Sequence, residues 1–407
     1  MKSLHLFFYP LYLCTISLEA VASLDTAVVS EGDVINFLHR GWLTIRNLLP
    51  DLSDASITRN IYEAEARARL KYVPATFKWL NDVHGVNCDG FKERCGHWNF
   101  DDFNATYLPT SAVHQVTDKG MRYLDCCMLV ANAKYRGDGS DKTVGFPYYQ
   151  SLNPHRWNDA VHKLATSKRM GSVAARLLQD PQIRLYQTAI FQKSNRTLNQ
   201  ETGWHQDLNM VPLDTGFNGY LTFWCPLTPL SAQLNDSLVV FATGSHRDVS
   251  FLHWFPSDMR YEQRKMILSD RYDISSAGSL EVGDCTVHHG WTWHTARVQP
   301  NTRPPRMAIA FSYVSNTARV LPDLPGNTTR HHRPFTYEDA VSYEDWLPDL
   351  EPMTNINHPL LPLVYDERNP SYLQYETKSN STSYGSVTSK TRVKKKMKKL
   401  KFGGSEL

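Results

Sequence analysis

Residues 203–207 read Gly203-Trp204-His205-Gln206-Asp207. Successive side chains of a β-strand point to opposite faces, so two residues at a spacing of two project to the same side. An imidazole and a carboxylate therefore stand side by side here, as in two thirds of a 2-His-1-carboxylate facial triad. Such a triad holds one face of a ferrous ion and leaves the other face open for substrate and oxygen.

A second stretch offers the third ligand. From Gly283 to His294 the sequence reads GDCTVHHGWTWH. A Gly-Asp turn followed by a short apolar and aromatic run that ends in histidine is typical of a strand that supplies such a ligand. His-x-Asp alone is common by chance, and the second stretch gives it weight. We predict that His205, Asp207 and His294 bind one metal ion and form the catalytic centre.

A strand with a clear alternation follows at residues 306–314, with the sequence RMAIAFSYV. One face would carry the arginine and small side chains, and the other face would carry Met, Ile, Phe and Tyr. The large side chains make a packing face. The small ones leave room for a ligand, and Arg306 offers a bidentate partner for a carboxylate. This pattern indicates an anionic co-substrate beside the metal site.

In combination these motifs resemble the phytanoyl-CoA dioxygenase family of Fe(II)/2-oxoglutarate oxygenases. The resemblance runs from about Val34 to about Val314. The matching pieces are Trp-His-Gln-Asp at 204–207, Phe-Ala-Thr-Gly-Ser-His at 241–246, Gly-Asp at 283–284, His294 and Arg306. Each motif is loose by itself, and their order and spacing make the resemblance specific.

The resemblance implies an iron-dependent oxidoreductase in which 2-oxoglutarate chelates Fe(II) and Arg306 holds its far carboxylate. Lys193 is a second candidate for that carboxylate, with a solvated strand-end lysine as the alternative. Trp224 either walls the site or packs in the core. Oxygen would be consumed and succinate and CO2 released as a small-molecule or lipid-like substrate is hydroxylated, with ascorbate as a candidate reductant. Relatives often have a hydroxyl residue two positions after the distal histidine, whereas this chain has Ala296.

Other functions remain open. A catalytically silent jelly-roll binding protein would keep the fold without turnover, and a zinc cupin would hold a different metal. In related iron halogenases a small residue stands at the carboxylate position and chloride takes the vacated coordination site. Asp207 fills that position here, so the resemblance implies oxygen insertion rather than halogenation.

Several nearby residues compete for these roles. His288 shares a strand face with His294, but six residues at a rise of roughly 3.3 Å would place the two about 20 Å apart. The two could therefore not bind one ion together. An arginine-led strand follows His294 at the family's approximate interval, so the resemblance favours His294 as the ligand. We expect His288 and His289 to be structural and His246 to brace a turn. Arg303 precedes two prolines, which places it in the loop before the strand.

The composition suits a globular protein with a large core. The chain has 407 residues, 41% of them hydrophobic and 12% aromatic, and its net charge of +3 gives no reason to expect a nucleic-acid partner. We predict an α+β protein with a mainly β core. The expected architecture is a double-stranded β-helix, or cupin-like jelly-roll, with a supporting layer of helices.

The expected domain spans residues 31–330. It opens with a short helix and a strand near Trp42, and helices are expected at 57–70 and 155–179. A loop-rich insertion is expected at about 80–150 and a polar, partly helical insertion at 251–276. The expected strands, with turn signals between them, are 183–193, 220–224 and 237–241.

The N-terminus predicts entry into the secretory pathway. Residues 1–23 have a basic start, an apolar run over 4–18 and a small-residue cleavage pattern, and the run is too short for a membrane span of roughly 20 residues. No later stretch is long and apolar enough to span. Phytanoyl-CoA itself does not suit a lumenal or secreted protein. Five glycosylation sequons agree with this route, at Asn104, Asn195, Asn235, Asn327 and Asn380.

Six cysteines remain beyond the signal segment. Cys88 and Cys95 flank a short loop and are candidates for a disulfide in an oxidising lumen. A metal site built from Cys88, Cys95 and His97 is the alternative, although its spacing fits no zinc template well.

The C-terminal part is predicted to lie outside the domain. Residues 331–389 form an irregular extension with one helix capped by Thr336. Residues 390–407 hold seven lysines, one arginine and one glutamate, a net charge of +7. This composition predicts a disordered tail, with contact to an anionic surface as the alternative.

Overall fold

The structure is a computed structural model that describes residues 28–66, 148–193, 201–248, 261–321 and 350–369, with scattered positions between 81 and 127. The chain divides into a compact unit that ends at Glu367 and a C-terminal unit that begins at Arg368. The predicted signal peptide at 1–23, the helix at Thr336 and the basic tail at 390–407 lie outside the described residues, as do four predicted glycosylation sites, Asn104, Asn195, Asn327 and Asn380. The fifth, Asn235, lies in an exposed turn.

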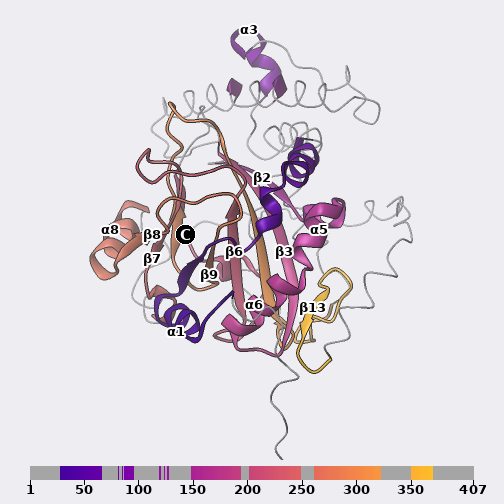
Figure 1. Ribbon diagram of the computed structural model, residues 1–407. Coiled ribbons are helices and arrows are strands. Elements are labelled where there is room, and N and C mark those ends of the chain that lie inside the picture. Colours follow the sequence, from indigo (N-terminus) through magenta and orange to yellow (C-terminus); the bar gives the residue numbers. More distant parts are fainter. Residues whose placement is uncertain are drawn as a thin grey trace, which may run out of the picture. The chain divides into compact units, whose positions relative to one another are not determined.

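Antiparallel sheets dominate the described structure (Figure 1). The larger sheet has seven strands in the order β1-β9-β6-β11-β3-β13, with β2 also paired to β3. These strands are β1 (Trp42–Ile45), β2 (Tyr149–Leu152), β3 (Gln182–Lys193), β6 (Tyr220–Pro226), β9 (Cys285–His289), β11 (Arg306–Ser315) and β13 (Leu363–Asp366). The strands expected at 183–193 and 220–224 are confirmed.

A four-stranded sheet carries the two predicted histidine ligands. Its order is β4-β10-β7-β8, and a two-stranded sheet pairs β12 with β5. The strands are β4 (Thr202–His205), β5 (Leu213–Asp214), β7 (Val239–Ala242), β8 (Ile274–Ser276), β10 (His294–Ala296) and β12 (Arg319–Val320). The expected strand at 237–241 therefore begins two residues later and ends one residue later.

Helices accompany the sheets. The α-helices are α1 (Glu31–Arg40), α3 (Lys92–Cys95), α5 (Asp159–Ala165), α6 (Lys168–Leu178) and α8 (Tyr261–Arg271), and residues 55–66 are also helical. Short 3-10 turns are η2 (Pro50–Ser53), η3 (Cys88–Phe91), η4 (Pro154–Arg156), η5 (Asp207–Met210) and η6 (Ser245–Arg247). Helices α5 and α6 supply side chains to the core on one face of the larger sheet (Figure 1).

Local sequence explains where two of these helices begin and end. Ser30 and Asp33 form a capping box at the start of α1, and Gly41 ends that helix at φ 76°, a conformation that favours glycine. The helical structure expected at 155–179 is confirmed, but it consists of two helices, because the chain is interrupted at Ser167. The Ser167 side chain accepts a hydrogen bond from the Met170 amide and starts α6 as a separate helix.

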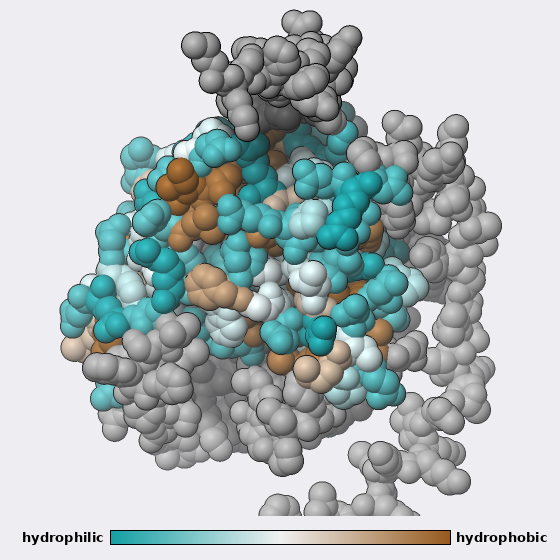
Figure 2. Space-filling view, turned by 90° about the horizontal axis from the view of Figure 1, so that it is seen from below, coloured by the Kyte–Doolittle hydropathy of each residue, from teal (hydrophilic) through white to brown (hydrophobic). Residues whose placement is uncertain are grey.

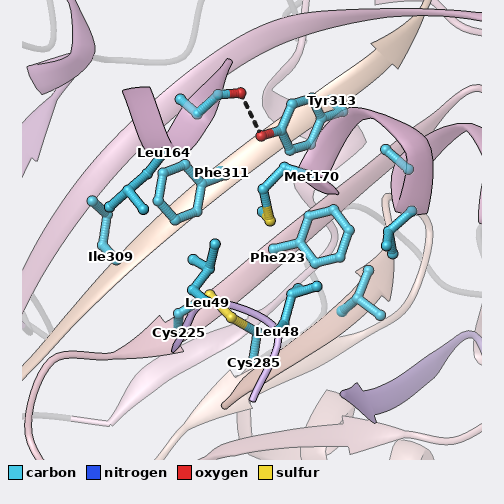
Figure 3. Close-up of a cluster of buried hydrophobic side chains, with 14 of the residues drawn as sticks. Leu48, Leu49, Leu164, Met170, Phe223, Cys225, Cys285, Ile309, Phe311 and Tyr313 are labelled. Carbon is cyan, nitrogen blue, oxygen red and sulfur yellow. Dashed lines mark hydrogen bonds between the residues drawn. A yellow bond between two sulfur atoms is a disulfide. The ribbon is translucent and has the colours of Figure 1, made fainter. Parts of the chain in front are cut away.

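The alternation predicted for β11 is confirmed. Met307, Ile309, Phe311 and Tyr313 face the core under the helices, where the Tyr313 hydroxyl donates to the Ala165 carbonyl at 2.7 Å (Figure 3). The small residues face the other way. Ala308 and Ala310 pack in a second cluster that draws on both sheets.

The inner faces of the two sheets pack against each other. Trp42 of β1 stacks on Phe241 of β7, with ring centroids 4.6 Å apart and 15° between the planes. Trp224 of β6 and Val239 of β7 belong to the same buried cluster. The small residues of β11 therefore border the space between the sheets, as the sequence pattern indicates.

The predicted Cys88–Cys95 disulfide is wrong. Cys88 pairs with Cys127 and Cys95 with Cys126. Residues 88–95 are helical, so seven steps along the axis hold the two Cα atoms roughly 10 Å apart, beyond the reach of a disulfide. The same pairing removes both cysteines from the alternative metal site; His97 lies outside the described residues.

A third disulfide joins neighbouring strands of the larger sheet. Cys225 of β6 and Cys285 of β9 are fully buried in the core beneath the helices (Figure 3). Three disulfides among the described residues are typical of proteins that fold in an oxidising compartment.

The predicted boundary at residue 330 falls short of the compact unit. Strand β13 pairs with β3, within the extension expected to be irregular. The guanidinium of Arg184 on β3 holds the segment before β13 against the sheet, because it donates to the Asn357 side chain and the Leu361 carbonyl, both at 2.7 Å. The expected insertion at 80–150 is described only in part, and its end forms β2 of the sheet.

The described surface gives no sign of a membrane span. None of the helices in the described ranges combines the length and apolar character that a crossing requires. On the face seen in Figure 2, apolar groups lie among hydrophilic ones. The exposed large apolar side chains come from separate elements, namely Ile35, Trp157, Phe217, Leu234, Met266, Val298 and Met353.

A buried histidine predicts acid sensitivity. His155 lies 2.7 Å from the Thr188 hydroxyl, and burial, followed by the charges of Arg156 and His162, lowers the pKa of His155 to about 3. The unfolded chain binds this proton near pH 6.5, so stability that is present above that pH is lost as the pH falls. We expect this residue alone to remove about 2 kcal/mol of unfolding free energy between pH 7 and pH 5.

Urea unfolding at the two pH values would measure this loss. In His155→Gln, which cannot take up the proton, the fall between pH 7 and pH 5 should be smaller by that amount. Equal falls in the variant and the unmutated protein would contradict the assignment.

Candidate metal centre

His205 and Asp207 occupy the end of β4 and the turn that follows it. β4 stops at His205, and Asp207 begins η5, so the pair lies at a strand end rather than within a continuous strand. Both side chains nevertheless line one cavity between the sheets. The His205 Nε2 atom lies 3.8 Å from the Asp207 Oδ1 atom.

His294 joins them from the neighbouring strand. It opens β10 directly opposite His205 in the antiparallel ladder, and the two rings lie 4.1 Å apart between centroids. The His294 Nε2 atom lies 3.5 Å from the Asp207 Oδ1 atom. One atom from each of the three side chains lies within 4.8 Å of the others, a spacing at which they could hold one metal ion.

The backbone orients both histidines. The Nδ1 atom of His205 lies 2.7 Å from the Gly203 carbonyl, and that of His294 lies 2.9 Å from the Thr292 carbonyl. A carbonyl can only accept, so each Nδ1 atom carries the proton and each Nε2 atom keeps its lone pair. This arrangement is common for histidines that bind metals.

The three groups are in the protonation states that metal binding requires. Burial lowers the pKa of both His205 and His294, which keeps the imidazoles neutral. Burial alone would raise the pKa of Asp207, but the adjacent histidines, His294 first, outweigh it and hold that pKa below its usual value. Two neutral imidazoles and a carboxylate can therefore bind a cation without first losing a proton.

His288 corrects one expectation. Its Nε2 atom lies 3.2 Å from the Asp207 Oδ2 atom, and its ring centroid is 4.3 Å from that of His294. The expected separation of about 20 Å assumed one continuous strand. Instead β9 ends at His289 and the chain turns before β10, which returns His294 to the side of His288.

The other histidines lie behind the sheet. His246 and His289 have ring centroids 5.1 Å apart, and the His246 Nε2 atom meets the Leu38 carbonyl at 3.0 Å. His246 thus ties the turn of η6 to the end of α1, as predicted. Burial lowers the pKa of His289 to about 3 and that of His246 to about 4.

Arg306 is buried in the wall of the same cavity. Its guanidinium lies 5.1 Å above the Trp224 ring, so Trp224 lines the site and supports the cation. Burial lowers the pKa of Arg306 to about 10, and its Nε atom has no hydrogen-bond partner among the described residues. A buried guanidinium with an unused donor in a cavity suits an anionic ligand such as a carboxylate.

The two rival cations have other partners. Arg303 donates to both oxygens of Asp236 at 2.8 and 2.9 Å and does not line the cavity, which supports the choice of Arg306. The Lys193 ammonium donates to the Ala296 and Arg297 carbonyls at 2.7 and 2.8 Å. Lys193 also does not line the cavity, so the structure gives no support to its candidate role as a carboxylate partner.

Burial and the nearby Arg306 charge lower the pKa of Lys193 to about 6. Lys193 is the direct cross-strand partner of Arg306. At neutral pH the Lys193 amine is therefore largely uncharged, and its N–H groups are used on the two backbone carbonyls. Arg306 remains the charged group of the cavity wall.

The sequence pattern did not single out two further polar residues of the cavity. Thr222 of β6 donates to the Asp207 Oδ2 atom at 2.7 Å, and Ser312 of β11 lies 3.0 Å from the Thr222 hydroxyl. The alternation of β6 could have found Thr222, because it shares an inward face with Trp224. The other lining residues, aside from those already described, are Tyr148, Gln150, Tyr186, Gln187, Ala189, Phe191, Thr202, Val211, Tyr220, Val239 and Thr295.

Comparison with solved structures finds proteins of low sequence identity. One is the non-heme α-ketoglutarate-dependent epimerase SnoN of nogalamycin biosynthesis, with 18% identity and a TM-score of 0.46 over 81% of this chain and 96% of that one. Another is the carbocyclase SnoK of the same biosynthesis, with 15% identity and a TM-score of 0.48 over 82% and 96%. EctD from S. alaskensis, with 2-oxoglutarate and 5-hydroxyectoine, has 14% identity and a TM-score of 0.43 over 73% and 80%.

Comparison with curated proteins finds no significant match. The family comparison does find one. Residues 108–308 match the family model described as phytanoyl-CoA dioxygenase (PhyH). This range contains the three candidate ligands and Arg306, and it identifies a phytanoyl-CoA dioxygenase (PhyH) domain within this chain.

Proposed function

We propose that the chain is an Fe(II)- and 2-oxoglutarate-dependent dioxygenase that hydroxylates a small-molecule or lipid-like substrate. The observation that carries this proposal is one cavity lined by His205, Asp207, His294 and the buried Arg306, whose Nε atom has no hydrogen-bond partner among the described residues. The facing antiparallel sheets would form the double-stranded β-helix predicted from the sequence.

The donor set fits the proposed metal. Two imidazole nitrogens and one carboxylate oxygen make the facial triad of non-heme Fe(II) oxygenases. His205, Asp207 and His294 would hold one face of the ion, and Arg306 would hold the far carboxylate of 2-oxoglutarate. Iron with 2-oxoglutarate and oxygen would supply the oxidation, releasing succinate and CO2.

The chain's own residues would orient the reactants and exclude water. Aromatic side chains line the cavity, among them Tyr186, Tyr220 and Trp224. Ala296, at the position where relatives often have a hydroxyl, also lines the cavity. It removes one potential hydrogen bond to the co-substrate and leaves Arg306 as the charged group that fixes it.

Succinate release tests the function. Purified protein should form succinate from 2-oxoglutarate when Fe(II), oxygen and ascorbate are present. Absence of turnover with bound iron would favour a silent binding protein, and zinc in the isolated protein would favour a zinc cupin. Untargeted metabolite comparison of the unmutated protein with His205→Ala in cells would identify the substrate.

We propose that the protein enters the secretory lumen. The predicted signal segment motivates this localisation, and the disulfides that join Cys88 to Cys127, Cys95 to Cys126 and Cys225 to Cys285 support it. Retention of the enzyme inside membrane-enclosed compartments or in the medium, with loss of residues 1–23, would be seen by fractionation and N-terminal sequencing.

Asp207 predicts the class of product. Its Oδ1 atom faces both histidines, so a hard anionic ligand fills the position that a halide would need. We expect oxygen insertion or a related desaturation and no chlorination, even with excess chloride and bromide. Mass spectrometry of the products decides this, and a halogenated product from the unmutated protein would overturn the role given to Asp207.

A further inference from the structure

The two oxygens of Asp207 have different surroundings. Oδ1 lies 3.8 Å and 3.5 Å from the Nε2 atoms of His205 and His294, so it faces the space where a metal would bind. Oδ2 faces the larger sheet. It accepts a hydrogen bond from the Thr222 hydroxyl at 2.7 Å and lies 3.2 Å from the His288 Nε2 atom.

The register of the larger sheet places the two residues that contact Oδ2 side by side. His288 of β9 is the direct cross-strand partner of Thr222 of β6, and Thr222 is the direct partner of Ser312 of β11. The three polar side chains therefore form a row across three adjacent strands. Thr222 uses its proton on Asp207, so Ser312 donates to the Thr222 oxygen and fixes that hydroxyl's direction.

We propose that His288 is a positioning residue that keeps Asp207 a one-oxygen ligand. Its Nε2–H group and the Thr222 hydroxyl both donate to Oδ2, so that only Oδ1 is free to bind the metal. A carboxylate without such donors can rotate and bind through both oxygens, which would occupy a coordination position that 2-oxoglutarate or oxygen needs. This inference rests on the proposed iron site.

A purely structural role explains the position of His288 less well. The ring is 2% exposed and lies beside Phe241, with centroids 5.5 Å apart, a setting in which an apolar side chain would pack without desolvating a polar group. Among the described residues its Nε2 atom bonds to Asp207 and its Nδ1 atom has no hydrogen-bond partner. A direct metal-ligand role fits less well too, because Nε2 is directed at Oδ2 and His288 falls outside the group of potential ligand atoms.

Leucine and glutamine variants separate these roles. His288→Leu removes the donor, whereas His288→Gln keeps an amide N–H that reaches about as far. Loss of a partner that orients a metal ligand typically costs roughly 10- to 100-fold in metal affinity. Calorimetric titration with Fe(II) in the absence of oxygen should show a loss in this range for His288→Leu and for Thr222→Val, and recovery to within a few-fold in His288→Gln.

A control comes from the same strand. His289 is as deeply buried as His288 but faces the opposite side of β9, so His289→Leu should leave Fe(II) affinity within about twofold of the unmutated protein. Thermal unfolding without metal reports whether each variant folds. If His288→Leu does not fold, the comparison of His288→Gln with Thr222→Val still tests the proposal.

The absorption spectrum of bound Co(II) gives a second measurement, because it reports the number and geometry of ligands. His288→Leu should change this spectrum, and His288→Gln should restore it. An unchanged Fe(II) affinity and Co(II) spectrum in folded His288→Leu, or a glutamine variant as impaired as the leucine variant, would overturn the proposal. Failure of the unmutated protein to bind Fe(II) would instead refute the proposed function.

Discussion

His294→Ala, and separately His205→Ala, should abolish Fe(II) binding and turnover while the protein stays folded. Each histidine supplies one of the three candidate ligand atoms that the described residues bring together, and a carboxylate with a single imidazole holds ferrous ion poorly. The loss should exceed the roughly 10- to 100-fold that follows removal of a residue that merely orients a ligand. Equilibrium dialysis with Fe(II) and succinate formation are the two measurements.

A buried histidine outside the cavity provides the control. His155→Gln should leave Fe(II) binding and turnover unchanged, since His155 hydrogen-bonds to Thr188 on β3 and does not line the site. Circular dichroism and thermal unfolding would show that all three variants fold. Turnover within a few-fold of the unmutated protein in either His205→Ala or His294→Ala would refute the triad.

Simple periodicity predicted the parts of the site that lie on regular strands. In β11 a repeat of two places Arg306 towards the cavity and Met307 towards the core, and both are observed. The two prolines after Arg303 predict that it lies in the loop before this strand, and its guanidinium pairs with Asp236 there. Where the backbone is extended, neighbouring positions have fixed opposite directions, so the sequence alone determines which side chains can meet.

Periodicity along one strand does not predict turns or contacts between residues that are far apart in the sequence. His288 was separated from His294 by counting residues along an assumed strand, but the turn after His289 brings the two rings together. The partners of Cys88 and Cys95 come from residues more than 30 positions away, at Cys126 and Cys127. Local spacing carries no information on such contacts, since they depend on how separate elements pack.

The row formed by His288, Thr222 and Ser312 could not be predicted from periodicity either. Alternation within each strand indicates which side each residue faces, but the register between strands decides that the three are neighbours. Register follows from the packing of whole strands. The sequence could therefore predict the three candidate ligands and could not predict what surrounds their carboxylate.

Arg306→Ala should chiefly raise the requirement for 2-oxoglutarate. The guanidinium is buried against Trp224 without a carboxylate partner among the described residues, so the co-substrate would supply its first strong acceptor. Loss of a charge-assisted pair costs roughly 1.5–3 kcal/mol, which corresponds to about a tenfold to hundredfold rise in the KM for 2-oxoglutarate. Once 2-oxoglutarate saturates the variant, kcat should recover to a large extent, because the metal ligands are untouched.

Two further arginine variants answer two questions. One is whether 2-oxoglutarate binding needs the planar guanidinium or only a positive charge. The other is whether the predicted strand register, which places Arg306 in the cavity, is right. Arg306→Lys should recover only part of the affinity, because an ammonium lacks the planar pair of donors that matches a carboxylate. Arg303→Ala should leave the KM for 2-oxoglutarate unchanged, since Arg303 forms an ion pair with Asp236 and does not line the cavity. If Arg303→Ala raised that KM and Arg306→Ala did not, the predicted strand register and the assignment of Arg306 to 2-oxoglutarate would both be wrong. The carboxylate site would then lie beside Asp236.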